Sequence, residues 1–397
     1  MRHIFLYFRK IPYVRTFVML LCVMMITLNF NIQFVMADGE PELAAPSALL
    51  MENSTGKILY DKNSHERRPM ASITKIMTML LAMEEIDAGR MEYDDMITGS
   101  AYAKSMGGST IFLDEGEQLS VRDIMKGIAV SSGNDAAVAM AEHISGSEET
   151  FVARMNERAA GLGMVDTHFV NCNGLDAEGH YSSAYDIALM SRELLKHPDI
   201  HNFTTIWMDT LRDGKFTLSN TNKLIRFYEG ATGLKTGSTS DALFCVSGTA
   251  KRDNMHLIAV IMASPTSKER VADASKLLNY GFANYAIKPV SNAGDIVGEQ
   301  AISKGVKRTT DLLIKEPFEV LAKKGETPQV EMKPVLTSEF VAPIEAGTPA
   351  GIMEYYIDGQ KAGESEIVFS ENIEKIKFSD IFMRMVRLWA SGCAQRV

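Results

Sequence analysis

The alternation of apolar and polar positions along the chain predicts a series of strands and helices. In the segment Ala48–Tyr60, two apolar runs flank a polar turn that ends in Gly56, which is typical of a β-hairpin. The strongly apolar segment Ser72–Asp87 begins just after Pro69 and stops near Gly89. Proline before and glycine after such a run are helix punctuation, so we predict a helix here.

The same criteria predict further helices and a pair of strands. Ser120 and Ser183 each precede an acidic residue by three positions, the spacing of a capping box at a helix start. Two apolar, β-rich runs, Ala242–Thr249 and Met255–Ala263, are separated by a polar turn and are expected to pair as antiparallel strands. The helices are expected at Val121–His143, Ala184–His197 and Lys268–Tyr285.

Beyond residue 285 the pattern changes. Short alternating segments such as Phe318–Ala322 and Gly351–Ile357 are split by glycine, proline and charged turns. We therefore predict a separate small all-β domain at residues 286–372.

The last segment, residues 373–397, has the period of an amphipathic helix. Arg384 and Arg387 lie opposite its apolar face, and the segment is too short and too charged to span a bilayer. We expect this helix to lie in the membrane interface, with packing on the β domain as the alternative. The apolar face comprises Phe378, Ile381, Phe382, Met385 and Trp389.

Residues 1–37 differ from the rest of the chain. Four basic residues precede the apolar run Thr16–Asn29, and the small-residue site Val35–Ala37 follows it. This order is that of a secretory signal peptide, so we expect export to the outer face of the cytoplasmic membrane or the cell wall space. An uncleaved transmembrane anchor is the alternative, because the run is only slightly shorter than the ~20 residues that span a bilayer.

Composition and charge narrow the classes of function. The chain has 397 residues, 46% of them hydrophobic, which is ample for a large core and more than one domain. Removal of the basic signal segment lowers the formal net charge from −9 to −13, so nucleic acid is not expected as a partner. After Cys22 is removed with the signal, the three remaining cysteines are widely spaced, and neither disulfides nor a metal or cofactor site are predicted.

The first candidate chemistry lies at the start of the predicted helix 72–87. Ser72 and Lys75 are three positions apart, which places the hydroxyl and the amine on one helical face. A serine hydroxyl needs a neighbour that accepts its proton, and a lysine does so only when burial or another cation keeps it neutral. Ser54 and Lys57 have the same spacing, but they fall in the hairpin turn, so we interpret Ser54 as structural.

Two further motifs supply complementary groups. Ser132 and Asn134 lie where the helix 121–143 is expected to break, and they offer a hydroxyl that passes a proton and an amide that holds a substrate carbonyl. Lys235, Thr236 and Gly237 open the apolar strand region with an ammonium, a hydroxyl and room for close approach of a substrate backbone. The Ser-x-Asn pattern recurs near the C-terminus, at residues 370–372, so no single motif is sufficient.

The ordered set resembles the penicillin-binding and serine β-lactamase superfamily. More closely, the chain resembles the D-alanyl-D-alanine carboxypeptidases among the low-molecular-mass penicillin-binding proteins. The resemblance covers the whole mature chain and implies an α+β fold, in which a domain at 38–285 has an antiparallel sheet flanked by helices. It rests on the runs Pro69–Lys75, Ala129–Ala136, Thr167–Asp176 and Gly230–Gly237.

The resemblance also implies roles for the motif residues. Ser72 would be acylated, with Lys75 as its general base, and Lys235 would help to keep Lys75 neutral. Ser132 would relay a proton towards the leaving group while Asn134 orients the peptide. The implied substrate is the peptidoglycan pentapeptide, from which the terminal D-alanine is removed, with β-lactam antibiotics as inhibitors.

The third motif would bind the end of the substrate. Thr236 would hold its terminal carboxylate, Gly237 would allow close approach, and the backbone N–H groups of Ser72 and Ser238 would form the oxyanion hole. Ser238 stands where the best-known members of the family carry histidine, which puts substrate preference in doubt.

Two alternative functions are a β-lactamase and a non-catalytic wall-binding or penicillin-sensing module. No Glu-x-x-Leu-Asn segment of the class A β-lactamase kind lies between the second and third motifs, and the intact motif set argues against the module. The histidines lack ligand spacing and are expected to be structural, although Asp176 and His180 fall in a loop that is a candidate for the edge of the site. The sequence leaves open the growth stage, cleavage of cross-links and the oligomeric state.

Overall fold

The computed structural model describes residues 39–337 and 339–394. The predicted signal segment and Cys22 lie outside the described residues. Within those ranges, no helix combines the length and the apolar character needed to cross a membrane.

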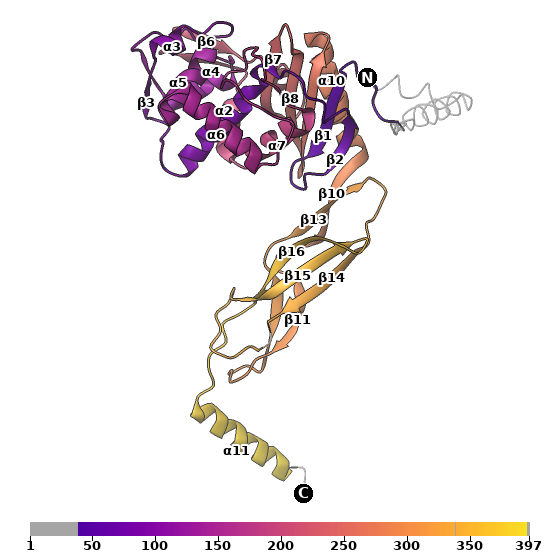
Figure 1. Ribbon diagram of the computed structural model, residues 1–397. Coiled ribbons are helices and arrows are strands. Elements are labelled where there is room, and N and C mark those ends of the chain that lie inside the picture. Colours follow the sequence, from indigo (N-terminus) through magenta and orange to yellow (C-terminus); the bar gives the residue numbers. More distant parts are fainter. Residues whose placement is uncertain (1–38, 338, 395–397) are drawn as a thin grey trace, which may run out of the picture. The chain divides into compact units, whose positions relative to one another are not determined.

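A five-stranded antiparallel sheet forms the centre of the first part of the chain, with strand order β2-β1-β9-β8-β7 (Figure 1). The predicted hairpin is confirmed as β1 and β2, and the predicted antiparallel pair as β8 and β9. Strand β7, which carries the Lys-Thr-Gly motif, is the edge strand beside β8. The bounds are β1 Ser47–Glu52, β2 Ile58–Lys62, β7 Ala231–Thr239, β8 Leu243–Arg252 and β9 Met255–Ser264.

Both faces of this sheet are covered because its strands are apolar on both sides. Successive side chains of a strand point to opposite faces. Leu49 and Met51 therefore join the core that contains α2 and α7 (Ala184–Leu194), while Ala48 and Leu50 join a second core against α10 (Ser267–Asn284). The predicted helix near 268–285 is thus confirmed as α10, and the one at 184–197 as α7, which ends at Leu194.

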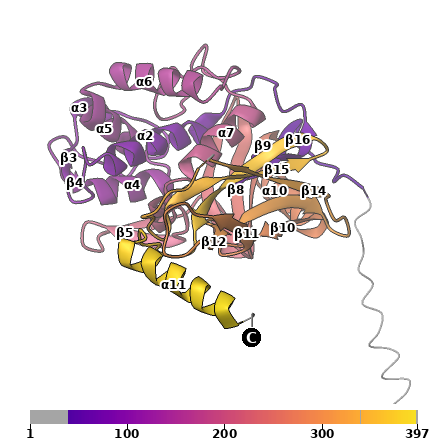
Figure 2. The same cartoon turned by 90° about the horizontal axis from the view of Figure 1, so that it is seen from below.

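Helices α4, α5 and α6 lie around α2 beside the sheet (Figures 1 and 2). The predicted helix 121–143 is two helices, broken at the Ser132 motif as expected. The side chains of Ser120 and Ser183 accept hydrogen bonds from the backbone N–H three residues on, so both predicted caps are present. The bounds are α2 Lys75–Asp87, α4 Val121–Ala129, α5 Asn134–Ser145 and α6 Glu148–Gly161.

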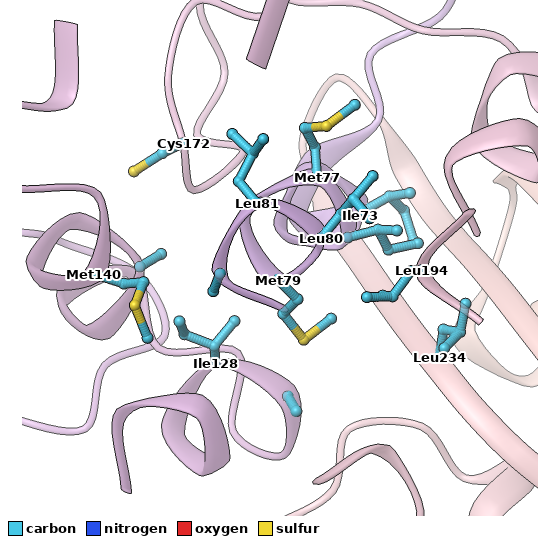
Figure 3. Close-up of a cluster of buried hydrophobic side chains, with 14 of the residues drawn as sticks. Ile73, Met77, Met79, Leu80, Leu81, Ile128, Met140, Cys172, Leu194 and Leu234 are labelled. Atoms are coloured by element: carbon cyan, nitrogen blue, oxygen red, sulfur yellow. The ribbon is translucent and has the colours of Figure 1, made fainter. Parts of the chain in front are cut away.

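Helix α2 is the centre of the larger core. Met77, Met79 and Met83 have no exposed surface, in agreement with the prediction that these methionines pack in the core. Figure 3 shows the helix surrounded by apolar side chains, with Ile128 and Met140 on one side and Leu194 and Leu234 on another. This packing holds the start of α2. The predicted helix began at Ser72, whereas α2 begins at Lys75 and Ser72 lies in a 3-10 turn just before it.

Residues after α10 form β strands, and the predicted α+β fold with a C-terminal all-β domain is confirmed. Strands β10 (Tyr285–Ser291) and β13 (Phe318–Lys323) pair with each other. The other five strands after α10 form a sheet of order β11-β12-β16-β15-β14. Their bounds are β11 Ile296–Ala301, β12 Thr309–Ile314, β14 Val330–Leu336, β15 Pro349–Ile357 and β16 Gln360–Phe369. Helix α11 spans Phe378–Ala394.

Candidate active site

Ser72 lies in a short 3-10 turn, η2 (Ala71–Thr74), which leads directly into α2. The tight turn and the three-residue spacing bring the two side chains of the first motif together. Lys75 Nζ lies 3.0 Å from Ser72 Oγ. Ser72 is half-buried, whereas Lys75 is completely buried.

Lys75 makes two further short contacts, both with acceptors. Its Nζ lies 2.5 Å from Asn134 Oδ1 and 2.6 Å from the backbone oxygen of Asn173. Burial lowers the pKa of Lys75 to about 7, against smaller opposing effects of Cys172 and Asp135. An amine with this pKa is partly neutral at neutral pH, which is the condition for a lysine to act as a base.

The second and third motifs meet although 103 residues separate them. Ser132 has a positive φ of 62° in the break between α4 and α5, and its Oγ accepts a hydrogen bond of 2.9 Å from Lys235 Nζ. Burial is the main cause that lowers the pKa of Lys235 well below its usual range, and the charge of Lys75 adds to it. Two like charges in one buried site are unfavourable, so Lys75 and Lys235 disfavour each other's protonation.

Asn134 is held by both ends of its amide. Its Nδ2 donates to the backbone oxygen of Gly107 at 2.7 Å, while its Oδ1 accepts from Lys75. The amide therefore links α5, Lys75 and the segment around Gly107. This arrangement orients Lys75, a role that the sequence analysis did not predict for Asn134.

A cavity of about 150 Å³ lies beside Ser72. Ser132, Thr236, Gly237 and Ser238 line it together with Ser72. Gly237 allows the approach of β7 to η2, because a Cβ at this position would lie 2.9 Å from the backbone nitrogen of Ser72. All eight residues predicted for the site therefore lie in the cavity wall or contact a residue that does.

Comparison with known proteins agrees with this arrangement. Residues 34–266 match the model of the D-alanyl-D-alanine carboxypeptidase family, and residues 285–375 match that of the penicillin-binding protein 5 C-terminal domain. The chain belongs to the D-alanyl-D-alanine carboxypeptidase family.

Individual relatives cover most of the chain. D-alanyl-D-alanine carboxypeptidase DacF of Bacillus subtilis is 45% identical over 364 residues, which are 90% of this chain and 94% of that protein. DacD of Escherichia coli is 37% identical, over 86% and 90% of the two chains. Penicillin-binding protein 5 of Haemophilus influenzae superposes with a TM-score of 0.68 at 31% identity, covering 85% of this chain and 99% of the other.

Sequence reasoning missed several residues of this carboxypeptidase site. Arg270 on α10 lines the cavity and is buried, with only 6% of its surface exposed. Its Nη2 lies 3.2 Å from Ser267 Oγ, its Nη1 lies 3.3 Å from the backbone oxygen of Gly237, and its Nε has no partner in the described residues. Ser109, Thr221 and Phe244 also line the cavity.

A sequence signal for Arg270 exists. The buried face of α10 includes Ala274, Leu277 and Leu278, and Arg270 continues the same face one turn earlier. A lone arginine on the apolar face of a helix is either paired or functional, because a buried charge without compensation is costly.

The second Ser-x-x-Lys pair lies outside the site. Ser54 is in the β1–β2 turn, where its Oγ donates to Glu52 Oε2 at 2.8 Å. The described cysteines Cys172 and Cys245 are buried and free.

Proposed function

We propose that Ser72 is the nucleophile with which this serine-type D-Ala-D-Ala carboxypeptidase removes the terminal D-alanine from peptidoglycan stem peptides. The observation that carries the proposal is the set of contacts around Lys75. A neutral amine has two hydrogens and one lone pair. Asn134 Oδ1 and the Asn173 carbonyl accept the two hydrogens of the neutral amine. Its lone pair then faces the Ser72 hydroxyl, whose Oγ lies 3.0 Å from Nζ, and in this form the hydroxyl is the donor.

Acylation then follows from the positions of the groups. Lys75 accepts the hydroxyl proton as Ser72 Oγ attacks the carbonyl carbon of the penultimate D-alanine. The backbone N–H groups of Ser72 and Ser238 stabilise the oxyanion of the tetrahedral intermediate, and the start of α2 adds its positive dipole end.

The leaving group needs a proton. Because Lys235 donates to Ser132 Oγ, the hydroxyl hydrogen of Ser132 is directed to another acceptor, the nitrogen of the departing D-alanine. The proton that Lys75 took from Ser72 then moves to Ser132 Oγ, so that Ser132 regains its hydroxyl hydrogen and Lys75 is a neutral base again. Water then attacks the carbonyl carbon of the Ser72 ester while Lys75 takes its proton. Lys75 returns this proton to Ser72 Oγ as the ester bond breaks and the shortened peptide leaves.

Arg270 and Thr236 form the binding site for the terminal carboxylate of the substrate. Among the described residues, no carboxylate pairs with Arg270. Burial accordingly lowers the pKa of its guanidinium. A buried cation that faces a cavity and lacks an anionic partner is completed by an anionic ligand. Thr236 and Gly237 line the same cavity from β7, and an aliphatic amino acid ending in a carboxylate suits this set.

The two Ser-x-x-Lys pairs provide the test. The intact protein is treated with a fluorescent penicillin, and the labelled peptide is identified by mass spectrometry. We expect a label on Ser72, no label in Ser72→Ala, and unchanged labelling in the matched control Ser54→Ala. Normal labelling of a folded Ser72→Ala protein would refute the assignment.

The ends of the chain support an exported, membrane-associated enzyme. The basic and apolar pattern of residues 1–37 supports export. In α11, Phe378 and Trp389 are 79% and 76% exposed, which supports insertion of this apolar face into a membrane interface. In this proposal residues 38–285 are the peptidase domain, 286–372 the β domain and 373–397 the anchor.

Vesicle flotation tests the anchor. The protein without residues 1–37 is expected to float with anionic lipid vesicles, and a version that ends at residue 376 is expected to remain at the bottom. Trp389→Glu should also reduce the fraction of protein that floats. Equal flotation of all three would contradict the proposed role of α11.

A further inference from the structure

His180 contacts the turn that carries the nucleophile. It lies in the loop between α6 and α7, and 6% of its surface is exposed. Its Nε2 lies 2.7 Å from Thr74 Oγ1, and Thr74 is completely buried. Thr74 lies between Ser72 and Lys75, and its hydroxyl has no role in the proposed chemistry.

The direction of each hydrogen bond in this contact is fixed by a backbone donor. The N–H of Val170 donates to His180 Nδ1 at 3.0 Å, so Nδ1 carries no hydrogen. A neutral imidazole then carries its hydrogen on Nε2, which donates to Thr74 Oγ1. The Thr74 hydroxyl in turn donates to the backbone oxygen of Ala71 at 2.8 Å.

This chain of hydrogen bonds ends at the backbone oxygen of Ala71, which belongs to the peptide group that joins Ala71 to Ser72. The oxygen of Ala71 and the N–H of Ser72 belong to the same planar unit and point in opposite directions. Fixing the oxygen therefore fixes the direction of the N–H. Ala71 has a φ of 49°, which an alanine adopts only when its surroundings impose it.

We propose that His180 is a positioning residue that orients the Ser72 N–H of the oxyanion hole through Thr74 and the Ala71 carbonyl. The inference rests on the proposed role of Ser72 and adds a residue to it. The relay requires the neutral imidazole with its hydrogen on Nε2, because either a charged ring or the other tautomer would set a second donor against the Val170 N–H.

The surroundings of the ring favour this neutral form. Burial lowers the pKa of His180 to about 4, and the charge of His168 acts in the same direction. Asp176 and Glu148 oppose the effect more weakly. The ring of Phe169 packs against it edge-on at 6.1 Å between centroids.

Glutamine, alanine and valine variants separate the relay from mere packing. His180→Gln keeps an acceptor for Val170 and a donor for Thr74, His180→Ala removes both, and Thr74→Val removes the hydroxyl at nearly constant shape. Acylation by a fluorescent penicillin is resolved into the dissociation constant of the noncovalent complex and the first-order acylation rate constant. D-alanine release from a diacetylated tripeptide ending in D-Ala-D-Ala is measured in parallel.

The expected result is a loss confined to the chemical step. In His180→Ala and Thr74→Val the acylation rate constant should fall at least ~10-fold. The complete loss of an oxyanion donor costs ~10²–10³-fold, and a misdirected donor should cost part of this. The dissociation constant should stay within about two-fold of the wild-type value. His180→Gln stays within about three-fold of the wild type because its amide repeats the donor and acceptor. His256→Gln is the matched control: burial also lowers the pKa of the half-buried His256 to about 4, but this histidine bonds to Thr232, so the substitution should leave acylation unchanged.

Two outcomes overturn the inference without touching the nucleophile. One is a folded His180→Ala protein that acylates Ser72 at the wild-type rate, and the other is a His180→Gln protein as slow as His180→Ala. If His180→Ala does not fold, nitrogen-15 NMR of the wild-type protein at pH 7 tests the relay instead. His180→Gln identifies the signals of the His180 ring, and a proton on Nδ1 of this ring would refute the relay. Labelling of Ser72→Ala would instead refute the proposed function.

Discussion

Gly174 packs so closely on Ala71 that no side chain fits between them. A Cβ built on Gly174 would lie 2.0 Å from the backbone oxygen of Ala71 and 2.8 Å from the nitrogen of Ser72. The loop that supplies the Asn173 carbonyl to Lys75 is therefore in direct backbone contact with the turn that carries Ser72. The two segments hold each other in place.

Gly174→Ala is expected to inactivate the enzyme by displacing this turn. A misplacement of about 1 Å at a reacting group costs on the order of 10²-fold in rate, so penicillin acylation should fall by about that factor. Gly179→Ala is the matched control. Both glycines have a positive φ, 88° and 81°, but at Gly179 the nearest atom to a Cβ is 3.8 Å away. Similar losses of acylation in both variants would show that backbone strain, not the collision, is responsible.

The pH dependence of acylation should follow Lys75. The neutral amine is the active form, so the acylation rate should rise about tenfold per pH unit at low pH and level off above about 7, where burial has set the pKa of Lys75. Lys75→Arg cannot lose its proton at these pH values, and we expect a loss of ~10²–10⁴-fold. Lys57→Arg, in the second Ser-x-x-Lys pair, should keep the wild-type profile. A flat profile between pH 5 and 9 would contradict the role of Lys75 as the base.

Arg270 should distinguish a free carboxylate from an amide at the end of the substrate. A hydrogen bond to a charged group contributes ~1.5–3 kcal/mol, so wild-type kcat/KM should drop ~10- to 150-fold when the terminal D-alanine is replaced by its amide. In Arg270→Gln this difference should shrink to a few-fold, with the loss falling on the acid substrate. If Arg270→Gln discriminates as well as the wild type, the carboxylate is bound elsewhere.

The elements that the sequence predicted well are those with local causes. The β1–β2 hairpin, the caps at Ser120 and Ser183, and the apolar period of α10 depend on residues a few positions apart, so the pattern contains the information. The break at Ser132 was also predictable because a Ser-Gly-Asn sequence ends a helix.

The contacts that assemble the site were not readable in the same way. The sequence named Ser132 and Lys235, but their 2.9 Å contact depends on how β7 packs beside the α4–α5 break. The Asn134 amide was assigned to substrate, whereas its two hydrogen bonds inside the protein emerge only from the packing of Gly107 and Lys75. His180 was expected to be structural because the histidines lack ligand spacing, although its loop was a candidate for the edge of the site. Its contact with Thr74, 106 residues away, leaves no spacing signal in the sequence.

Asp135 should control the stability of the segment that lines the cavity opposite β7. Its carboxylate is 1% exposed and accepts hydrogen bonds from the backbone N–H groups of Ile111, at 3.0 Å, and Leu113, at 2.9 Å. Asp135→Ala would leave these two buried donors without partners, at a cost of about 1–3 kcal/mol each, so we expect a loss of roughly 2–6 kcal/mol in the free energy of unfolding.

Asp135→Ala should also slow acylation, because the segment held by Asp135 includes Ser109. The backbone oxygen of Ser109 accepts the backbone N–H of Asn134 at 2.7 Å, and Ser109 lines the cavity. Asp123→Ala is the control. Asp123 lies in the first turn of the neighbouring α4 and forms a partly exposed ion pair with Lys126 at 3.6 Å, which contributes about 1 kcal/mol or less. Denaturant unfolding of the two variants, with penicillin acylation at a temperature where both are folded, measures the two effects. Equal stability of the two variants would mean that water replaces the carboxylate as the acceptor for Ile111 and Leu113.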